Sequence, residues 1–126
     1  MRTMNSSIDL EQAPSGVAVV VVKGEHDLAT ADTLRDTISR AIQSGDGVVV
    51  DLNHAEFIDS AVLRVLIVGQ QQSDDAGTGF AIAITDSTGH AVRTLLELTG
   101  LDRKLTVAPG RAEALAVVAE AEGLAS

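Results

Sequence analysis

The chain has 126 residues, of which 45% are hydrophobic, and this length suits one folded domain with one core. A formal net charge of -9 disfavours nucleic acid and anionic membrane surfaces as partners, and an aromatic content of 2% leaves few side chains for base stacking. Cysteine is absent, which excludes disulfide bonds, and no apolar run is long enough to span a bilayer, so we expect a cytoplasmic protein that binds neither nucleic acid nor membrane.

Strand-like and helix-like hydrophobic patterns alternate along the chain. The apolar run Val17–Val22 is typical of a strand covered on both faces, and Gly24 is expected to end it. Apolar residues recur at helical spacing from Thr30 to Ser44, with Thr30 in the position of an N-cap, and Gly100 is expected to stop the third helix. In chain order, the predicted elements are strands at 8–11 and 17–22, a helix at 30–44, a strand at 48–52, a helix at 60–74, a strand at 80–84, a helix at 87–98, a strand at 105–107 and a helix at 111–122.

Strands that alternate with helices indicate crossover connections and a mostly parallel sheet. The first two strands are separated only by a short turn, so we expect them to be antiparallel. The predicted fold class is therefore α/β: a single domain with a mixed, mostly parallel sheet of four to five strands and about four helices. We expect residues 1–7 to form a flexible N-terminus and residues 8–122 to form the domain. In such sheets binding sites gather where the strands end, here at residues 24–30 and 53–60.

The segment Phe57–Leu63 follows an apolar strand and begins a helix with a carboxylate beside a hydroxyl, those of Asp59 and Ser60. Backbone N–H groups point outward at the start of a helix, so a phosphate on a hydroxyl there is electrostatically favoured. Ser60 is open to two interpretations, a plain N-cap or a phosphorylated switch, and Asp59 is an alternative N-cap. Asp27 is open to a similar choice between a loop carboxylate and a contact with a partner.

Three segments resemble motifs of STAS domains in the anti-sigma factor antagonist (anti-anti-sigma factor) family. Gly24–Ala31, which reads Gly-Glu-His-Asp-Leu-Ala-Thr-Ala, is similar to the family signature Gly-Glu-x-Asp-x-x-(Thr/Ser)-Ala. Phe57–Ser60 is similar to the Phe-(Met/Ile)-Asp-Ser motif, and Leu98–Leu101 is similar to an element that follows the third helix of the family. The three segments occur in the family's order, and the resemblance extends over roughly Ile8–Glu122, which supports a single STAS-like domain.

This resemblance implies a protein–protein switch in bacterial transcription control. The unphosphorylated antagonist binds an anti-sigma factor, usually a serine kinase of the histidine-kinase-like ATPase class, and thereby frees a sigma factor. The kinase then phosphorylates the serine after the motif aspartate, the complex dissociates, and a phosphatase resets the system. Carried over to this chain, the resemblance implies that Ser60 is the phosphoacceptor and that Asp27 and Asp59 lie beside it on the docking surface.

The sequence departs from the family pattern directly after Ser60. The family commonly reads Asp-Ser-(Ser/Thr)-Gly-Leu, whereas this chain reads Asp-Ser-Ala-Val-Leu, and Arg64 stands where a small residue is usual. Valine in place of glycine adds a stiff, branched side chain where a partner approaches, so the expected partner surface includes Val62 and Arg64 together with Asp27, Asp59 and Ser60. The departure also favours an alternative, an unswitched STAS scaffold in a stress-signalling assembly or a lipid-transport complex, with Ser60 only a helix cap.

Catalytic, metal and cofactor sites lack their sequence signatures. The three histidines, His26, His54 and His90, do not have metal-ligand spacing, and no nucleophile-elbow glycines surround Ser60. Gly77–Gly79 is not followed by the Gly-Lys-Ser/Thr of a phosphate-binding loop. A phosphoaccepting receiver domain needs an acidic cluster after its first strand and a lysine after its last strand, and neither stands where it is required. We therefore expect no enzymatic activity, no cofactor and no metal, and we expect the chain to be a kinase substrate rather than a catalyst.

Overall fold

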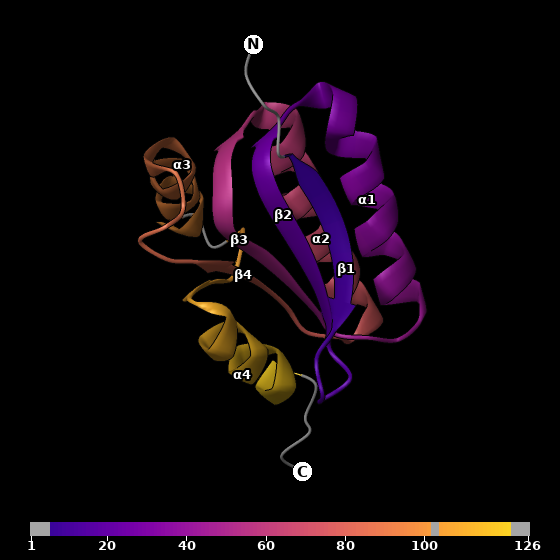
Figure 1. Cartoon of the computed structure of the whole chain (residues 1–126). Coiled ribbons are helices and arrows are strands. Elements are labelled where there is room, and N and C mark those ends of the chain that lie inside the picture. Colours follow the sequence, from indigo (N-terminus) through magenta and orange to yellow (C-terminus); the bar gives the residue numbers. More distant parts are fainter. Residues whose placement is uncertain (1–5, 102–103, 122–126) are drawn as a thin grey trace.

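The structure is a computed structural model that describes residues 6–101 and 104–121, with only the backbone for residues 99–101. In chain order its elements are β1 (Ser7–Gln12), β2 (Ala18–His26), α1 (Leu28–Gln43), β3 (Val48–Ile58), α2 (Ser60–Ala76), β4 (Phe80–Ile84), α3 (His90–Leu101), β5 (Val107–Pro109) and α4 (Arg111–Ala121). The strands form one sheet in the order β1-β2-β3-β4-β5, in which β1 is antiparallel to β2 and each later pair is parallel (Figure 1). The predicted α/β class, with its mixed and mostly parallel sheet, is confirmed.

Helices cover both faces of the sheet, but they do so unequally (Figure 1). The larger core joins three helices to the sheet and contains Leu34 and Ile38 of α1, Leu66 of α2, Leu96 of α3, and Val20, Val50 and Leu52 of β2 and β3. The smaller core joins α4 to the opposite face and contains Ala114 and Val118 of α4 with Val19, Val49, Ala81 and Ala83. Each fully buried Val or Leu contributes about 1.5–3 kcal/mol, so these aliphatic side chains hold a fold that has almost no aromatic residues.

β2 and β3 are longer than the sequence pattern predicts, and they carry the chain to the rim where α1 and α2 begin. The expected stop at Gly24 is wrong, because β2 passes through this glycine in a register shift against β3. Gly24 has φ 83, and a Cβ atom there would lie 2.7 Å from Ser6 Oγ, so glycine permits the close approach of the preceding chain without ending the strand. Residues 1–5 of the expected flexible N-terminus lie outside the described residues, whereas Ser7 already begins β1.

α3 also begins and ends later than expected. Thr88 does not start the helix, because its hydroxyl donates to the Leu52 carbonyl oxygen at 3.0 Å and accepts from the Thr85 amide at 3.0 Å. These bonds hold a turn against β3, and α3 begins only at His90. The expected stop at Gly100 is wrong as well, since the helical backbone continues to Leu101. None of the described helices is both long and apolar enough to cross a membrane.

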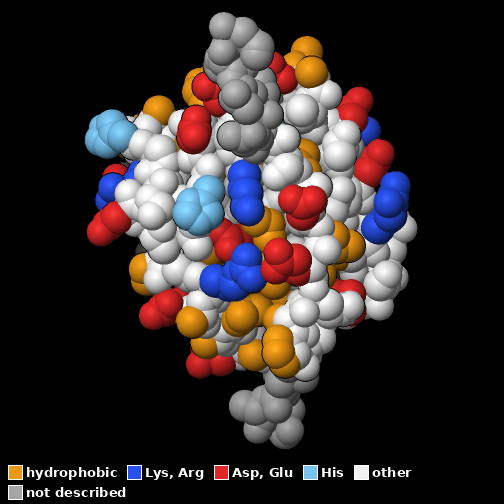
Figure 2. Space-filling view, in the orientation of Figure 1, with side chains coloured by type: hydrophobic (Ala, Val, Ile, Leu, Met, Phe, Trp, Pro, Cys, Tyr) orange, Lys and Arg blue, Asp and Glu red, His pale blue; other side chains and the backbone are white. Residues whose placement is uncertain are grey.

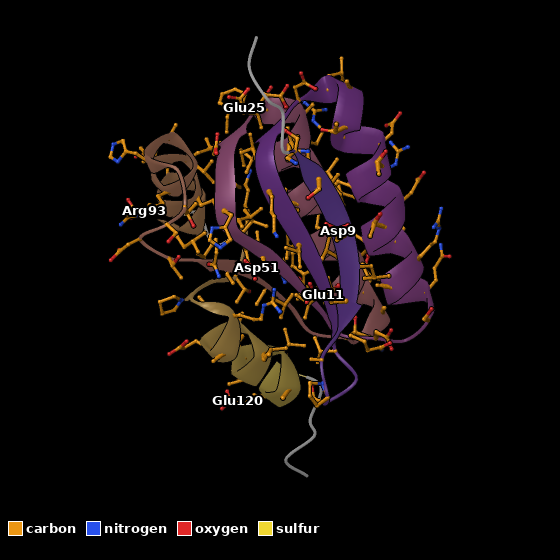
Figure 3. The ribbon with its side chains drawn as sticks, in the orientation of Figure 1. Asp9, Glu11, Glu25, Asp51, Arg93 and Glu120 are labelled. Atoms are coloured by element: carbon orange, nitrogen blue, oxygen red, sulfur yellow. The ribbon has the colours of Figure 1, made fainter. Side chains whose placement is uncertain are left out.

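A charged network fastens α4 to the sheet face opposite α1 and α2, and Figure 3 labels two of its members, Asp51 and Glu11. Arg111, the first residue of α4, donates to Asp51 at 2.8 Å and to Glu11 at 3.1 Å. Burial by itself would lower the pKa of Arg111, but the hydrogen bonds to Asp51 and Glu11 raise it overall, so the guanidinium stays charged. The Asp51 side chain is only 6% exposed, and its other carboxylate oxygen accepts from the Asn53 amide at 2.9 Å, so Arg111 supplies the positive charge that a buried carboxylate needs.

Candidate functional site

The site lies on the rim where β2 and β3 end side by side. His26 and Ile58, the last residues of these parallel strands, are paired in the sheet register. The next residue of each strand is an aspartate, Asp27 or Asp59, and each is the N-cap of the helix that follows. α1 and α2 then pack along each other. The structure thus brings together the two segments that the sequence predicted to meet at the carboxyl ends of the strands.

Asp27 caps α1 in a reciprocal arrangement with Thr30. The carboxylate of Asp27 accepts from the Ala29 amide at 2.9 Å, while the Thr30 hydroxyl accepts from the Asp27 amide at 3.2 Å. Thr30 also lies 3.0 Å from Nδ1 of His26, whose Nε2 donates to the Lys23 carbonyl oxygen at 2.8 Å. The expectation that Thr30 is the N-cap is therefore wrong: Asp27 has that position and Thr30 completes a capping box three residues later.

Asp59 caps α2 without a reciprocal partner. Its carboxylate accepts from the Val62 amide at 3.1 Å, and the side chain is half-buried. Ser60 is the first residue of α2 and is exposed, and among the described residues its hydroxyl makes no hydrogen bond. The interpretation of Ser60 as a helix cap is wrong, because Asp59 fulfils that role. The Ser60 hydroxyl is consequently free at the start of the helix.

Val62 and Arg64 lie on different sides of α2. The side chain of Val62 is fully buried and belongs to the larger core, so the expectation that it contacts a partner is wrong. For the same reason, valine in place of the family glycine does not obstruct the surface beside Ser60. Arg64, in contrast, is exposed on the same side of α2 as Ser60, and both residues line one hollow.

Two exposed apolar side chains flank the rim and were not predicted as site residues. Leu28 is 74% exposed and Phe57 is 45% exposed, and both lie close in sequence to the aspartates that cap α1 and α2. Leu28 lines the hollow of about 340 Å³ between α1 and α2, together with Arg35 of α1 and with Ser60 and Arg64 of α2. Phe57 stands in the motif that contains Ser60, but the motif alone does not indicate whether its ring faces the core or solvent.

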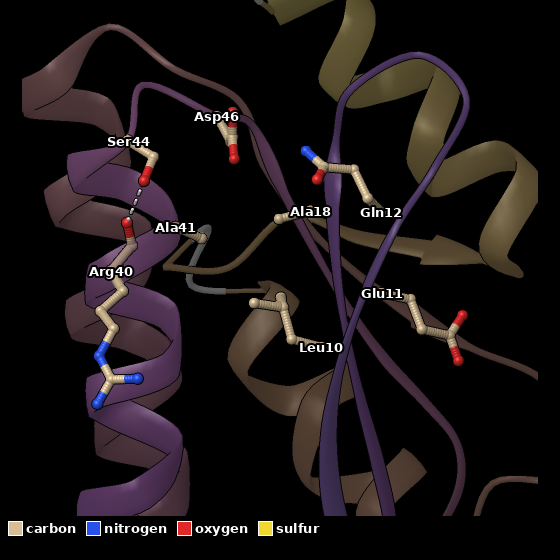
Figure 4. A pocket seen from close by; sticks show the side chains of 8 residues that line it. All are labelled: Leu10, Glu11, Gln12, Ala18, Arg40, Ala41, Ser44 and Asp46. Carbon is tan, nitrogen blue, oxygen red and sulfur yellow. Dashed lines mark hydrogen bonds between the residues drawn. The ribbon is translucent and has the colours of Figure 1, made fainter.

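A second hollow lies at the C-terminal end of α1, and Ser60 does not line it (Figure 4). It measures about 330 Å³ and lies between β1 and the end of α1, with Leu10, Arg40 and Asp46 among its lining residues. The hydroxyl of Ser44, which also lines it, donates to the Arg40 carbonyl oxygen at 3.0 Å, so this hydroxyl is engaged in ending the helix. This hollow contains none of the predicted site residues.

The face of the sheet beside α4 carries charges of both signs over β1, β2 and β3 (Figure 2). Lys23 and His54, which are both exposed, are paired in the register of β2 and β3, and Asp9 of β1 is exposed as well. Among the described residues, no group of three or more His, Cys, Asp or Glu lies close enough to hold a metal ion. His26 is buried with both ring nitrogens engaged, so it does not contribute to this surface.

Comparison with known proteins identifies the family to which this fold belongs. The profile of the STAS domain matches residues 7–114 of the chain. The chain belongs to the STAS domain family. The motif segments at the ends of β2 and β3 therefore lie within a STAS domain, and they form its rim around Asp27, Asp59 and Ser60.

Several relatives of this STAS domain are named anti-sigma factor antagonists. The anti-sigma-F factor antagonist RsfB of Mycobacterium tuberculosis is 31% identical over 90 residues, which are 71% of this chain and 70% of the relative. An anti-sigma F factor antagonist of Paenibacillus polymyxa is 28% identical over 114 residues, or 89% of this chain and 94% of the relative. The crystal structure of an anti-sigma factor antagonist from Mycobacterium paratuberculosis is similar with a TM-score of 0.75 and 31% identity, covering 89% of this chain and 92% of that one.

Proposed function

We propose that this chain is an anti-sigma factor antagonist whose binding is switched off by phosphorylation of Ser60. In this proposal it binds an anti-sigma factor of the serine-kinase type in the cytoplasm, and the bound sigma factor is released to direct transcription. The names of its STAS relatives support the general function. The observation that carries the switch is the exposed Ser60 hydroxyl, which has no hydrogen bond among the described residues and stands at the first position of α2.

The rim around Ser60 has the composition of a protein-binding surface. Leu28 and Phe57 offer apolar area that would be removed from water by a partner, and large side chains of this kind dominate the energetics of many interfaces. Asp27, Asp59 and Arg64 surround them with charged groups that would select the orientation of the partner. We therefore assign the partner contact to Leu28 and Phe57 in addition to these charged residues.

The chemistry at Ser60 is a phosphoryl transfer catalysed by the partner. The hydroxyl oxygen of Ser60 forms a bond to the γ-phosphorus of ATP, the bond to the β-phosphate oxygen breaks, ADP leaves, and the hydroxyl proton passes to a base of the kinase. A phosphatase reverses the step by hydrolysis, which returns the hydroxyl and releases inorganic phosphate. In this scheme the chain supplies an accessible hydroxyl, and the catalytic groups belong to its partners.

The added phosphate weakens binding through charge and hydration. It carries a charge of about -1.5 to -2. The dipole of α2 stabilises a negative group at the start of the helix by roughly 0.3–1 kcal/mol. Repulsion from a carboxylate such as Asp59 amounts to roughly 3 kcal/mol for unit charges about 6 Å apart at an effective dielectric constant of about 20, but it acts in the free chain and in the complex alike. In a packed interface the phosphate would also lose water without gaining a partner. A penalty of about 3 kcal/mol in the interface reduces affinity more than a hundredfold, while the fold itself tolerates a charge at this exposed position.

The test is phosphorylation of the purified chain by its anti-sigma kinase with ATP, followed by mass spectrometric mapping. A single phosphate on Ser60 supports the proposal, whereas a phosphate elsewhere, or none with a demonstrably active kinase, refutes the switch. Binding of a Ser60→Asp variant distinguishes the switch from the alternative function, an unswitched scaffold. Weakened binding supports the switch, and unchanged binding supports an unswitched STAS scaffold.

A further inference from the structure

The hollow beside Ser60 contains two arginines in a chain whose overall charge is strongly negative. The sequence has 9 Lys and Arg residues against 18 Asp and Glu residues. Arg64 of α2 and Arg35 of α1 nevertheless line the same hollow of about 340 Å³ as the Ser60 hydroxyl. Asp32 lines the hollow as well, so two of its three charged lining residues are cations, in a chain that has twice as many acidic as basic residues.

Arg64 is placed to reach a group attached to Ser60. The two residues are four positions apart in α2, so their side chains lie above one another on the same helix face. Among the described residues, Arg64 has no ion pair and no side-chain hydrogen bond, and it is exposed. No internal contact has to be broken for its guanidinium to turn toward the start of the helix.

Arg35 is already paired, but its pairs are weak. It lies 3.0 Å from Asp32 and 3.8 Å from Asp36, and the side chains of these three residues are 52%, 79% and 60% exposed, respectively. Exposed ion pairs of this kind contribute little to stability, because water screens them. A phosphate dianion offers a more strongly charged acceptor than either carboxylate, and guanidinium groups bind phosphate with two parallel hydrogen bonds.

We propose that Arg64 binds the phosphate of phosphorylated Ser60, with Arg35 as the second cation on the other wall of the hollow. The inference rests on the proposed function, because it assumes that Ser60 is the phosphoacceptor. Its consequence is a sharper switch. In the free chain the arginines stabilise the phosphate. In the complex the partner covers the hollow and restricts the movement of the arginines. Phosphorylation therefore weakens binding by more than the penalty of placing the phosphate in the interface.

The test uses the full chain with phosphoserine incorporated at position 60 during translation, so that it needs neither kinase nor partner. The second ionisation of the phosphate is titrated by ³¹P NMR at low ionic strength. A nearby guanidinium favours the dianion and lowers the phosphate pKa, so we expect Arg64→Gln to raise this pKa by about half a unit or more. Arg35→Gln should raise it less, and Arg64→Lys should restore part of the wild-type value.

Arg40→Gln is the matched control, since it removes the same charge from an exposed arginine near the other end of α1. It should leave the phosphate pKa unchanged, and high salt should reduce the difference between the wild type and Arg64→Gln. Equal phosphate pKa values in the wild type and Arg64→Gln would overturn the inference and leave the proposed function intact. Failure of the kinase to modify Ser60 would instead overturn the proposed function, whatever the titration shows.

Discussion

α1 and α2 begin in the same way, but the hydroxyl near the start of each helix has a different role. Each helix follows a strand of the same parallel pair, and each is capped by an aspartate, Asp27 or Asp59. In α1 the nearby hydroxyl belongs to Thr30, three residues after the cap, and it closes the capping box. In α2 the hydroxyl belongs to Ser60, directly after the cap, and it makes no hydrogen bond among the described residues. The hydroxyl three residues after the cap is therefore structural, whereas the hydroxyl directly after the cap is left available for modification.

Geometry explains why this spacing decides the outcome. A side chain at the third helical position can reach back to the amide of the cap residue, whereas one at the first position points away from it. Thr30 is further fixed by buried His26, which connects the start of α1 to the Lys23 carbonyl oxygen of β2. α2 is held instead by Asp59 and by the burial of Val62, so the exposed side of its first turn can change without cost to the core.

The largest effect is expected from phosphorylation of Ser60 itself. The phosphorylated chain should bind the anti-sigma kinase more than about a hundredfold more weakly than the unmodified chain, because a phosphate that loses its water in the interface without gaining a partner costs about 3 kcal/mol. Isothermal titration calorimetry with both forms measures the ratio. Urea denaturation of both forms is the control and should show similar free energies of unfolding. A ratio near one would mean that Ser60 lies outside the interface.

Thr30→Val should have the next largest effect, and it should act on stability. The substitution preserves the shape of the side chain but removes the hydroxyl that accepts from the Asp27 amide and contacts His26. The loss of a capping interaction, with a buried ring nitrogen left without its partner, should lower the free energy of unfolding by about 1–2 kcal/mol. Chemical denaturation measures this value. A change below about 0.5 kcal/mol would mean that the capping box contributes no more than an ordinary surface contact.

The sequence was sufficient for the parts of this rim that local chemistry determines. The strand at Phe80–Ile84 has the predicted bounds, and the start of α2 beside Asp59 follows from an apolar run, a cap residue and a helical pattern. The order of elements also predicted that the two capped segments would meet at one edge of the sheet. The first two features depend on residues close together in the chain, and the third follows from a general rule for parallel sheets, that their strands end at the same edge.

Other features depend on contacts between distant residues, and there the sequence pattern was insufficient. Asp27 and Thr30 are both good cap residues, and the choice between them depends on how far β2 runs along β3 before α1 begins. The buried position of Val62 depends on the rotation of α2 against the core, which a departure from a family motif does not reveal. Leu28 fits an amphipathic pattern equally well inside or outside, so its exposure became visible only in the structure.

Asp59→Ala should lower stability by about 1 kcal/mol, close to the usual value for an aspartate N-cap. The carboxylate of Asp59 accepts from the Val62 amide, and alanine would leave that amide without this acceptor at a half-buried position. Asp59→Asn is the control, because asparagine also caps helices and should retain most of the stability. If both variants lost the same amount, the charge of Asp59, rather than its hydrogen bond, would be the stabilising feature.

Ser60→Ala should have the smallest effect, with a change in the free energy of unfolding below about 0.5 kcal/mol. The hydroxyl of Ser60 is exposed and unbonded among the described residues, and alanine is a better helix former than serine, so any change should be slightly stabilising. Urea denaturation beside Thr30→Val makes the comparison direct, since the two variants remove one hydroxyl each from the first turns of neighbouring helices. A loss of about 1 kcal/mol in Ser60→Ala would show that this hydroxyl also has a structural role. Phosphorylation would then disturb the start of α2 itself, and the partner would be released by a change in the helix rather than by charge on an otherwise unchanged surface.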